Sequence, residues 1–301
     1  MSFSSNVKAE LCKISMNKKC CALAEAYGVL LYCNTFSEKE VRIVTGSPDF
    51  AARLQKLFKR AFGLGFDVLP AQQTKGKQIF LITDGEKIKK IFNACGYEPG
   101  TMIAHHINLG VLEEDCCREA FVRGGFLAGG SVTDPQKRYH LELVTDHFNV
   151  SRGAYSILLE MGFSPKDTAR AGNYITYFKQ SEAIEDFLTT IGAPLSAMEI
   201  MAAKVEKDMR NAINRRVNCD SANADKVVNA AQEQLEALRR IEREIGIENL
   251  PENLQEAALL RIANPEASLA DLAVLSDPPV SKSGLSHRLR KLMEIAKKNE
   301  E

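Results

Sequence analysis

The chain of 301 residues is long enough for two or three domains, and its 45% hydrophobic and 26% charged residues are ordinary for a soluble globular protein. It has no apolar run of about 18 residues and no basic leader followed by an apolar stretch, so we expect neither a membrane span nor a signal peptide. The formal net charge of zero argues against a uniformly basic nucleic-acid-binding surface.

Eight cysteines are distributed over the chain: Cys12, Cys20, Cys21, Cys33, Cys95, Cys116, Cys117 and Cys219. None forms a CxxC pair, and no histidine stands nearby at zinc-ligand spacing, so the sequence predicts no metal site and no cofactor. Adjacent cysteines do not suit a disulfide framework. We therefore expect free, mostly buried thiols in a reducing cytoplasm.

The first half of the chain begins with a polar stretch, residues 1–18, to which no element is assigned. Apolar spacing then predicts a helix over 20–33, a strand over 40–46, a helix over 49–63, a strand over 77–83 and a helix over 84–96. Gly63 and Gly96 are expected to end the second and third of these helices, because glycine readily follows a helix C-terminus.

The same order of elements recurs further along the chain. Helices are predicted over 117–130, 149–163 and 181–192, and strands over 138–145 and 173–179. An offset of 96 residues aligns Gly28 with Gly124 and Gly96 with Gly192. The sequence therefore indicates two copies of one α/β unit, residues 1–105 and 106–193, with a small insertion in the second. The alternative is a coincidence between generic amphipathic helices.

After Gly192 no strand pattern remains, so residues 194–301 are expected to form an all-α domain that begins near Pro194. The first part is predicted to hold at least two helices, broken near "NCDSAN" at residues 218–223. The remainder is predicted to form three short helices. The overall fold class is α+β.

Residues 268–298 have the features of a helix-turn-helix. Ser268 is a candidate N-cap with Asp271 at capping-box spacing, and prolines in "SDPP" end the helix. Ser281 is the next candidate N-cap. The apolar face of the first helix is predicted to contain Leu269, Leu272, Ala273 and Leu275, and that of the second Leu285, Leu289, Leu292 and Ile295.

The second of these helices is basic: residues 281–298 carry six lysines and arginines against one acid. A helix of this kind is expected to lie in the major groove of double-stranded DNA, with its first residues at base edges and later cations on phosphates. The alternative is a solvated basic helix in a protein-binding bundle. The predicted DNA-contacting residues are Ser281, Lys282, Ser283, Ser286, His287, Arg288, Arg290 and Lys291.

Glycines are concentrated in the predicted helix "FVRGGFLAGGSV" (121–132), and small residues at four-residue spacing permit close helix packing. This helix and its counterpart "GVLLYCNTF" resemble the LAGLIDADG motif of homing endonucleases, whose helices each end in an acid that binds Mg²⁺. Cys33 and Gly129 occupy those positions here, and neither is a hard oxygen ligand. The resemblance implies a retained fold with lost catalysis. An active nuclease would need relocated ligands, such as Asp134 or Glu38.

The segments "DMRNAINRRVNCDSANADKVVNAA" and "DPPVSKSGLSHRLRKL", with the degenerate LAGLIDADG helices, resemble the WhiA family over nearly the whole chain. The resemblance implies a cytoplasmic, nucleoid-associated, non-enzymatic DNA-binding protein that acts in cell division, chromosome segregation or transcription during sporulation. Another transcription regulator or the transcription machinery would be a further partner. The N-terminal domain would supply DNA contacts, through basic residues near strand ends, or a protein-docking scaffold. Those basic residues are Lys75, Lys77, Lys137, Arg138 and Arg152.

Overall fold

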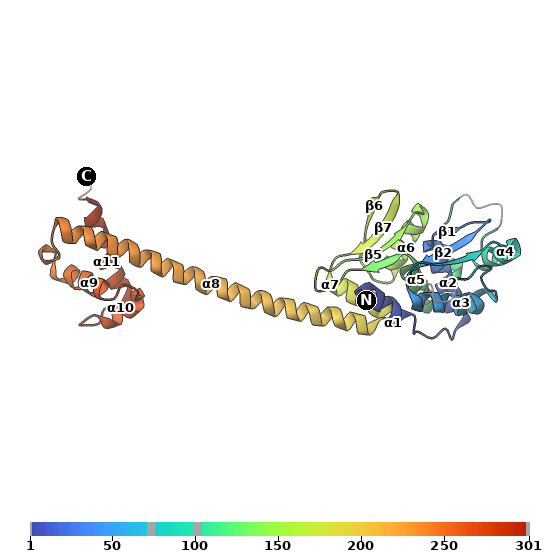
Figure 1. Ribbon diagram of the computed structural model, residues 1–301, viewed down its shortest axis with the longest axis horizontal. Coiled ribbons are helices and arrows are strands. Elements are labelled where there is room, and N and C mark those ends of the chain that lie inside the picture. Colours follow the sequence, from blue (N-terminus) through green and yellow to red (C-terminus); the bar gives the residue numbers. More distant parts are fainter. Residues whose placement is uncertain (1, 71–75, 99–103, 299–301) are drawn as a thin grey trace. The chain divides into compact units, whose positions relative to one another are not determined.

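The computed structural model describes residues 2–70, 76–98 and 104–298 (Figure 1). Contacts divide the chain into two units: unit 1, Met1–Asp208, and unit 2, Met209–Glu301. The division falls inside one helix, α8 (Pro194–Glu244), rather than near Pro194 as the sequence predicted. The reason is that the first turns of α8 bury Ala197, Ile200 and Ala203 against unit 1.

Unit 1 contains the predicted internal repeat, and its two copies share the same element order. The first copy consists of α2 (Lys19–Tyr32), β1 (Thr35–Phe36), β2 (Val41–Thr45), α3 (Pro48–Phe62), β3 (Gln78–Ile82) and α4 (Gly85–Ala94). After the short 3-10 helix η1 (Leu109–Val111), the second consists of α5 (Asp115–Gly129), β4 (Gly130–Val132), β5 (Leu141–Thr145), α6 (Phe148–Glu160), β6 (Lys166–Arg170), β7 (Asn173–Phe178) and α7 (Ser181–Ile191). Figure 1 shows α2 and α5 together between the two copies.

Each copy has its own antiparallel sheet. The first sheet has the order β1-β2-β3, with Ile43 opposite Phe80, and the second has the order β4-β5-β7-β6, with Leu143 opposite Thr176. Among the described residues of the first copy, the counterpart of strand β6 is a single bridge between Val68 and Leu81. The sequence did not predict β1, β4 or β6, because two of them are too short to show alternation and β6 is exposed along its whole length.

The polar N-terminal stretch forms a helix that the sequence did not predict, α1 (Phe3–Leu11). Its three large apolar residues, Phe3, Val7 and Leu11, recur every four positions and are all buried in the core of unit 1. This spacing is the helical signal that the polar composition obscured. The predicted helix ends at Gly63 and Gly192 are confirmed, since both adopt the left-handed conformation after α3 and α7.

Helix α8 is continuous over 51 residues, so the predicted break near residues 218–223 is wrong. Asn, Asp and Ser have low helix propensity, but residues 195–245 contain neither proline nor glycine, and nothing in them forces the backbone out of the helix. Among the described residues, no helix is long and apolar enough to cross a membrane.

Unit 2 is all-α, as predicted. The end of α8 is followed by the short 3-10 helix η2 (Ile247–Asn249) and then by α9 (Glu252–Ala263), α10 (Leu269–Leu275) and α11 (Lys282–Lys298). Its core joins Leu238 and Ile241 of α8 to Leu254 of α9, and to Leu285 and Leu289 of α11. Helix α11 thus has one face fixed against three other elements of unit 2.

Candidate nucleic-acid interface

Helix α10 begins with the predicted capping box. The backbone N–H of Asp271 donates to Ser268 Oγ at 3.2 Å, and the N–H of Ser268 donates to the Asp271 carboxylate at 3.3 Å. Leu272 and Ala273 are buried as predicted, and Leu269 is half-buried. The prediction was wrong for Leu275, which is 55% exposed. Leu275 is the last residue of α10.

The connection from α10 to α11 is longer than a usual helix-turn-helix turn, but it is held by one buried side chain. Ser276 Oγ lies 3.0 Å from the carbonyl oxygen of Ala273 and accepts the N–H of Val280 at 3.0 Å. The same N–H also reaches the Ala273 carbonyl at 3.2 Å. These bonds fold the "SDPP" segment back on the end of α10 and fix where α11 begins.

Helix α11 is capped at Ser281, as predicted, because Ser281 Oγ accepts the N–H of Gly284 at 3.1 Å. Leu285, Leu289 and Leu292 are buried, in agreement with the predicted apolar face. The fourth buried position is Ala296, whereas the predicted Ile295 is only half-buried. At the C-terminal end of α11 the buried face is therefore rotated slightly around the helix axis relative to the predicted face.

The face of α11 opposite this stripe is exposed and basic. At about 100° per residue, Ser283, His287, Arg290 and Lys291 project on the side away from the buried leucines. Ser281, Lys282 and Ser286 are exposed as well, so seven of the eight predicted residues are accessible.

Arg288 is the exception among the predicted DNA-contacting residues. It is half-buried, and its guanidinium donates to the Glu256 carboxylate of α9 at 2.9 Å. The ion pair directs this side chain toward the helix packed behind α11 rather than outward. In the structure Arg288 holds α11 on α9 instead of standing free on the exposed face.

Helices α2 and α5 approach so closely that their glycines leave no room for side chains. A Cβ at Gly28 would lie 2.1 Å from the carbonyl oxygen of Phe121, and one at Gly124 would lie 2.0 Å from that of Glu25. Real Cβ atoms do not occur at such distances, so both positions require glycine. The predicted seam of small residues is confirmed, and we call α2 and α5 the seam helices.

Cys33 follows the last residue of α2, at one of the two positions where the LAGLIDADG resemblance implies an acid. Its Sγ lies 3.1 Å from the carbonyl oxygen of Leu30 and 3.2 Å from that of Thr35. Burial raises the pKa of the Cys33 thiol to about 12. A neutral thiol that donates to backbone carbonyls is not a ligand for Mg²⁺.

Gly129, the other such position, ends α5 and is enclosed by backbone. A Cβ there would lie 2.5 Å from the carbonyl oxygen of Val144 and 3.0 Å from the ring of Tyr32. The sequence singled out Gly129 as the position of a lost ligand. The structure corrects this, because Gly129 is also a packing glycine and its surroundings exclude a carboxylate side chain.

Other carboxylates do not replace the missing pair. Asp134 caps its own turn by accepting the N–H of Gln136 at 2.9 Å, and Glu38 is exposed in the loop after β1. The sequence missed Asp146, which follows β5, contributes to raising the pKa of Cys33 and pairs with His147 at 3.3 Å. Among the described residues, no group of three or more potential metal ligands gathers at the C-terminal ends of the seam helices.

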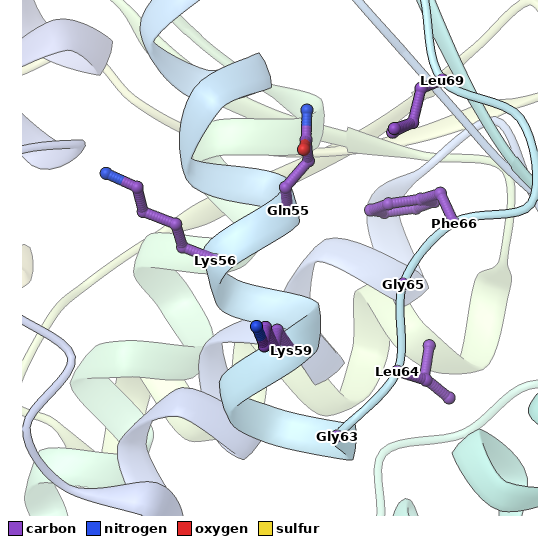
Figure 2. Close-up of a pocket in the computed structure, with 8 residues that line it drawn as sticks. All are labelled: Gln55, Lys56, Lys59, Gly63, Leu64, Gly65, Phe66 and Leu69. Atoms are coloured by element: carbon purple, nitrogen blue, oxygen red, sulfur yellow. The ribbon is translucent and has the colours of Figure 1, made fainter.

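A cavity of about 420 Å³ lies elsewhere in unit 1, between α3 and the segment that follows it (Figure 2). Its apolar side is formed by Leu64, Phe66 and Leu69, and Gln55 and Lys59 lie on the helical side. In Figure 2 the Lys56 side chain extends away from Phe66. No acid, histidine or cysteine lines the cavity among the described residues, so it holds none of the usual metal ligands.

The two units define a class of protein in which a LAGLIDADG-like fold without its acidic pair precedes a helix-turn-helix domain. The family model described as the WhiA LAGLIDADG-like domain matches residues 35–107 and 118–210, and the model described as the WhiA C-terminal HTH domain matches residues 213–296. The chain therefore belongs to the WhiA family.

Individual relatives agree with this assignment. The chain is 39% identical over 306 residues to the probable cell division protein WhiA of Ruminiclostridium cellulolyticum, covering 99% of this chain and 98% of the relative. It is 35% identical to the protein of the same name from Alkaliphilus metalliredigens, with 98% of each chain covered. The crystal structure of full-length DUF199/WhiA from Thermatoga maritima has a TM-score of 0.60 at 24% identity, with 99% of each chain covered, and supports the fold.

Proposed function

We propose that this protein is a sequence-specific, non-enzymatic DNA-binding regulator of cell division, and that α11 is its recognition helix. The observation that carries the proposal is the outward face of α11, where Ser283, His287, Arg290 and Lys291 are exposed while the opposite face is anchored in the core of unit 2. Membership of the WhiA family and the names of its curated relatives support the role in cell division.

In this proposal the N-terminal half of α11 enters the major groove. Ser283 and His287 are placed to meet base edges, and the N-terminal end of the helix favours a nearby phosphate through its partial positive charge. Arg290 and Lys291, one turn further along, would hold phosphates or a guanine edge. Arg288 contributes indirectly, because its bond to Glu256 fixes the rotation of α11.

Replacing Arg290 and Lys291 by alanine should weaken binding to double-stranded DNA and flatten its salt dependence. Each lost phosphate contact reduces the slope of log affinity against log salt by about 1, so we expect a decrease of about 2 for the double variant. Fluorescence anisotropy with a mixed-sequence duplex over a salt series measures this slope.

The matched control for that measurement is Arg239→Ala with Arg243→Ala, which removes the same charge from exposed positions of α8 in the same unit. The control should retain the slope of the unchanged chain. Equal slopes for the two double variants, or no binding by the unchanged chain at low salt, would show that α11 is not the DNA-binding face. Selection from a random duplex pool then tests sequence specificity.

We also propose that unit 1 has no nuclease activity and that a single substitution does not restore it. Cys33→Asp places one carboxylate at the end of α2, but Gly129 cannot accept its partner because Val144 and Tyr32 occupy the space of a Cβ. Nicking of supercoiled plasmid with Mg²⁺ should therefore remain at background for the unchanged chain and for Cys33→Asp. Cutting by the unchanged chain that is lost in Asp146→Asn, Asp134→Asn or Glu38→Gln would overturn the proposal.

Unit 1 has two candidate roles in this regulator: further DNA contacts, or docking of another transcription regulator or the transcription machinery. Lys77, Lys137, Arg138 and Arg152 are exposed, whereas Lys75 lies outside the described residues. Strand β6 adds the exposed side chains of Lys166 and Arg170, which the sequence did not single out. The DNA affinity of residues 1–208 alone, compared with that of the full chain, distinguishes the two roles.

A cytoplasmic, nucleoid-associated location and roles in chromosome segregation or sporulation belong to the same proposal. The proposed DNA binding and the resemblance to the family support them. Genome-wide mapping of bound DNA, with and without residues 268–301, tests them. Discrete binding sites that disappear with α10 and α11 are the expected result, and sites that persist would locate DNA recognition elsewhere in the chain.

A further inference from the structure

Four cysteines that the sequence analysis treated as unrelated free thiols lie together in unit 1. Cys20 and Cys21 are in the first turn of α2, and Cys116 and Cys117 are in the first turn of α5. Their four Sγ atoms all lie within 4.8 Å of one another. All eight cysteines of the chain are free, but only Cys95 and Cys117 are buried, so the expectation of mostly buried thiols is wrong.

The internal repeat explains why two separate Cys-Cys pairs meet. Both pairs occupy the same position in their copy of the repeat, at the start of a seam helix. The glycines at the seam allow α2 and α5 to approach closely, which also brings their first turns together. Spacing along the chain does not reveal this arrangement, because the two pairs come from different copies and neither forms a CxxC motif.

The distances suit a single metal ion. Four sulfurs at about 2.3 Å from a tetrahedral Zn²⁺ are about 3.8 Å apart. The Sγ atoms of Cys20 and Cys21 are 4.0 Å apart, and the whole set lies within 4.8 Å, so small side-chain rotations close the site. A four-iron cluster would hold its cysteine sulfurs further apart, since the iron atoms lie between them. A tetrathiolate geometry of this size therefore favours zinc.

Positive charge lies close to the four sulfurs. All four cysteines lie in the first turns of α2 and α5, and in the described structure neither helix has a side-chain hydrogen bond at its N-cap. The partial positive charges of two helix N-termini are directed at this point. The ammonium of Lys18 lies 3.8 Å from Cys116 Sγ and adds a full positive charge. Together they offset the double negative charge of zinc bound by four thiolates.

We propose that Cys20, Cys21, Cys116 and Cys117 bind one Zn²⁺ ion that ties together the N-terminal ends of the seam helices. Binding displaces the thiol protons to solvent and involves no redox change. The site is structural, because all four positions around the metal are filled by protein. It lies at the opposite ends of the seam helices from Cys33 and Gly129, so it is independent of the former nuclease positions.

Zinc content of the full-length chain, purified under reducing conditions, tests the proposal. Elemental analysis should find one equivalent of zinc per chain in the unchanged protein and none above background in Cys116→Ser with Cys117→Ser. Cys219→Ser, which removes an exposed cysteine from α8, is the control and should retain the full equivalent. Zinc retained by the double variant would contradict the site, as would its absence from the unchanged protein together with failure to bind added zinc.

Two further measurements keep the test decisive if the double variant does not fold. Adding Co²⁺ to the metal-free, unchanged chain should give the visible absorption of a tetrahedral thiolate complex, which added Zn²⁺ then displaces. Chelation should lower the unfolding midpoint of unit 1 and expose four additional thiols to a thiol reagent. Stoichiometric iron with thiolate-to-iron absorption, or disulfides between the two pairs in the reduced preparation, would overturn the zinc assignment.

Discussion

Replacing Gly124 by alanine destabilises unit 1 by about 3 kcal/mol. The added Cβ would lie 2.0 Å from the carbonyl oxygen of Glu25 and 3.1 Å from the backbone nitrogen of Val29. Both atoms belong to the backbone of α2, so the clash is relieved only by moving the two seam helices apart. Overpacking usually costs about 1–3 kcal/mol, and a clash between two backbones belongs at the upper end of that range.

Tyrosine fluorescence during urea unfolding measures this effect in the full chain. All seven tyrosines lie in unit 1 and the chain has no tryptophan, so the signal reports on unit 1 alone. The control is Gly85→Ala in the first turn of α4, where a Cβ meets nothing within 4 Å. Alanine normally stabilises a helix relative to glycine, so the control should be neutral or slightly stabilising. Equal midpoints for the two variants would show that the seam tolerates a side chain at Gly124.

The fold of unit 1 could be predicted in outline because its signals are local. Helical and strand periodicity, together with glycine at helix ends, depend only on neighbouring residues, and their repetition showed the two copies. The predictions failed where burial depends on distant parts of the chain. Helix α1 is polar overall yet buries Phe3, Val7 and Leu11. Strands β1 and β4 come after the seam helices, and each forms because it pairs with the edge of its sheet, β1 with β2 and β4 with β5.

The candidate DNA-binding face could be predicted because the apolar residues of α11 recur at regular helical spacing. Once the buried leucines were identified, most polar residues had to lie on the exposed side. The ion pair of Arg288 could not be predicted from spacing, because its partner Glu256 belongs to α9, 32 residues earlier in the chain. The zinc site was missed for the same reason, since it arises from contacts between the two copies of the repeat. Gly129 is enclosed by Tyr32 of the other copy and by Val144 of its own, 15 residues further along the chain.

Replacing Glu25 by glutamine should have the second large effect, a loss of about 3–5 kcal/mol from the stability of unit 1. The Glu25 carboxylate is 1% exposed and accepts from Arg53 at 2.5 and 2.8 Å and from Arg123 at 2.9 Å. It joins α2, α3 and α5, and its bond to Arg53 raises the pKa of that guanidinium despite the opposing effect of burial. Without the carboxylate, two buried arginines lose their counter-charge, and breaking such a group is strongly destabilising.

A comparison with Glu86→Gln tests whether the loss of stability in Glu25→Gln is caused by the burial of the carboxylate. Glu86 also pairs with a cation, Lys89 at 2.8 Å, but its side chain is 84% exposed, so water and salt screen the pair. The same chemical change should therefore leave the tyrosine-monitored midpoint nearly unchanged at position 86 and lower it strongly at position 25. Adding Arg123→Met to Glu25→Gln should recover part of the loss, because one uncompensated charge is then removed. A double variant less stable than Glu25→Gln would show that Arg123 stabilises unit 1 mainly through the Ile191 carbonyl, to which it donates at 3.0 Å.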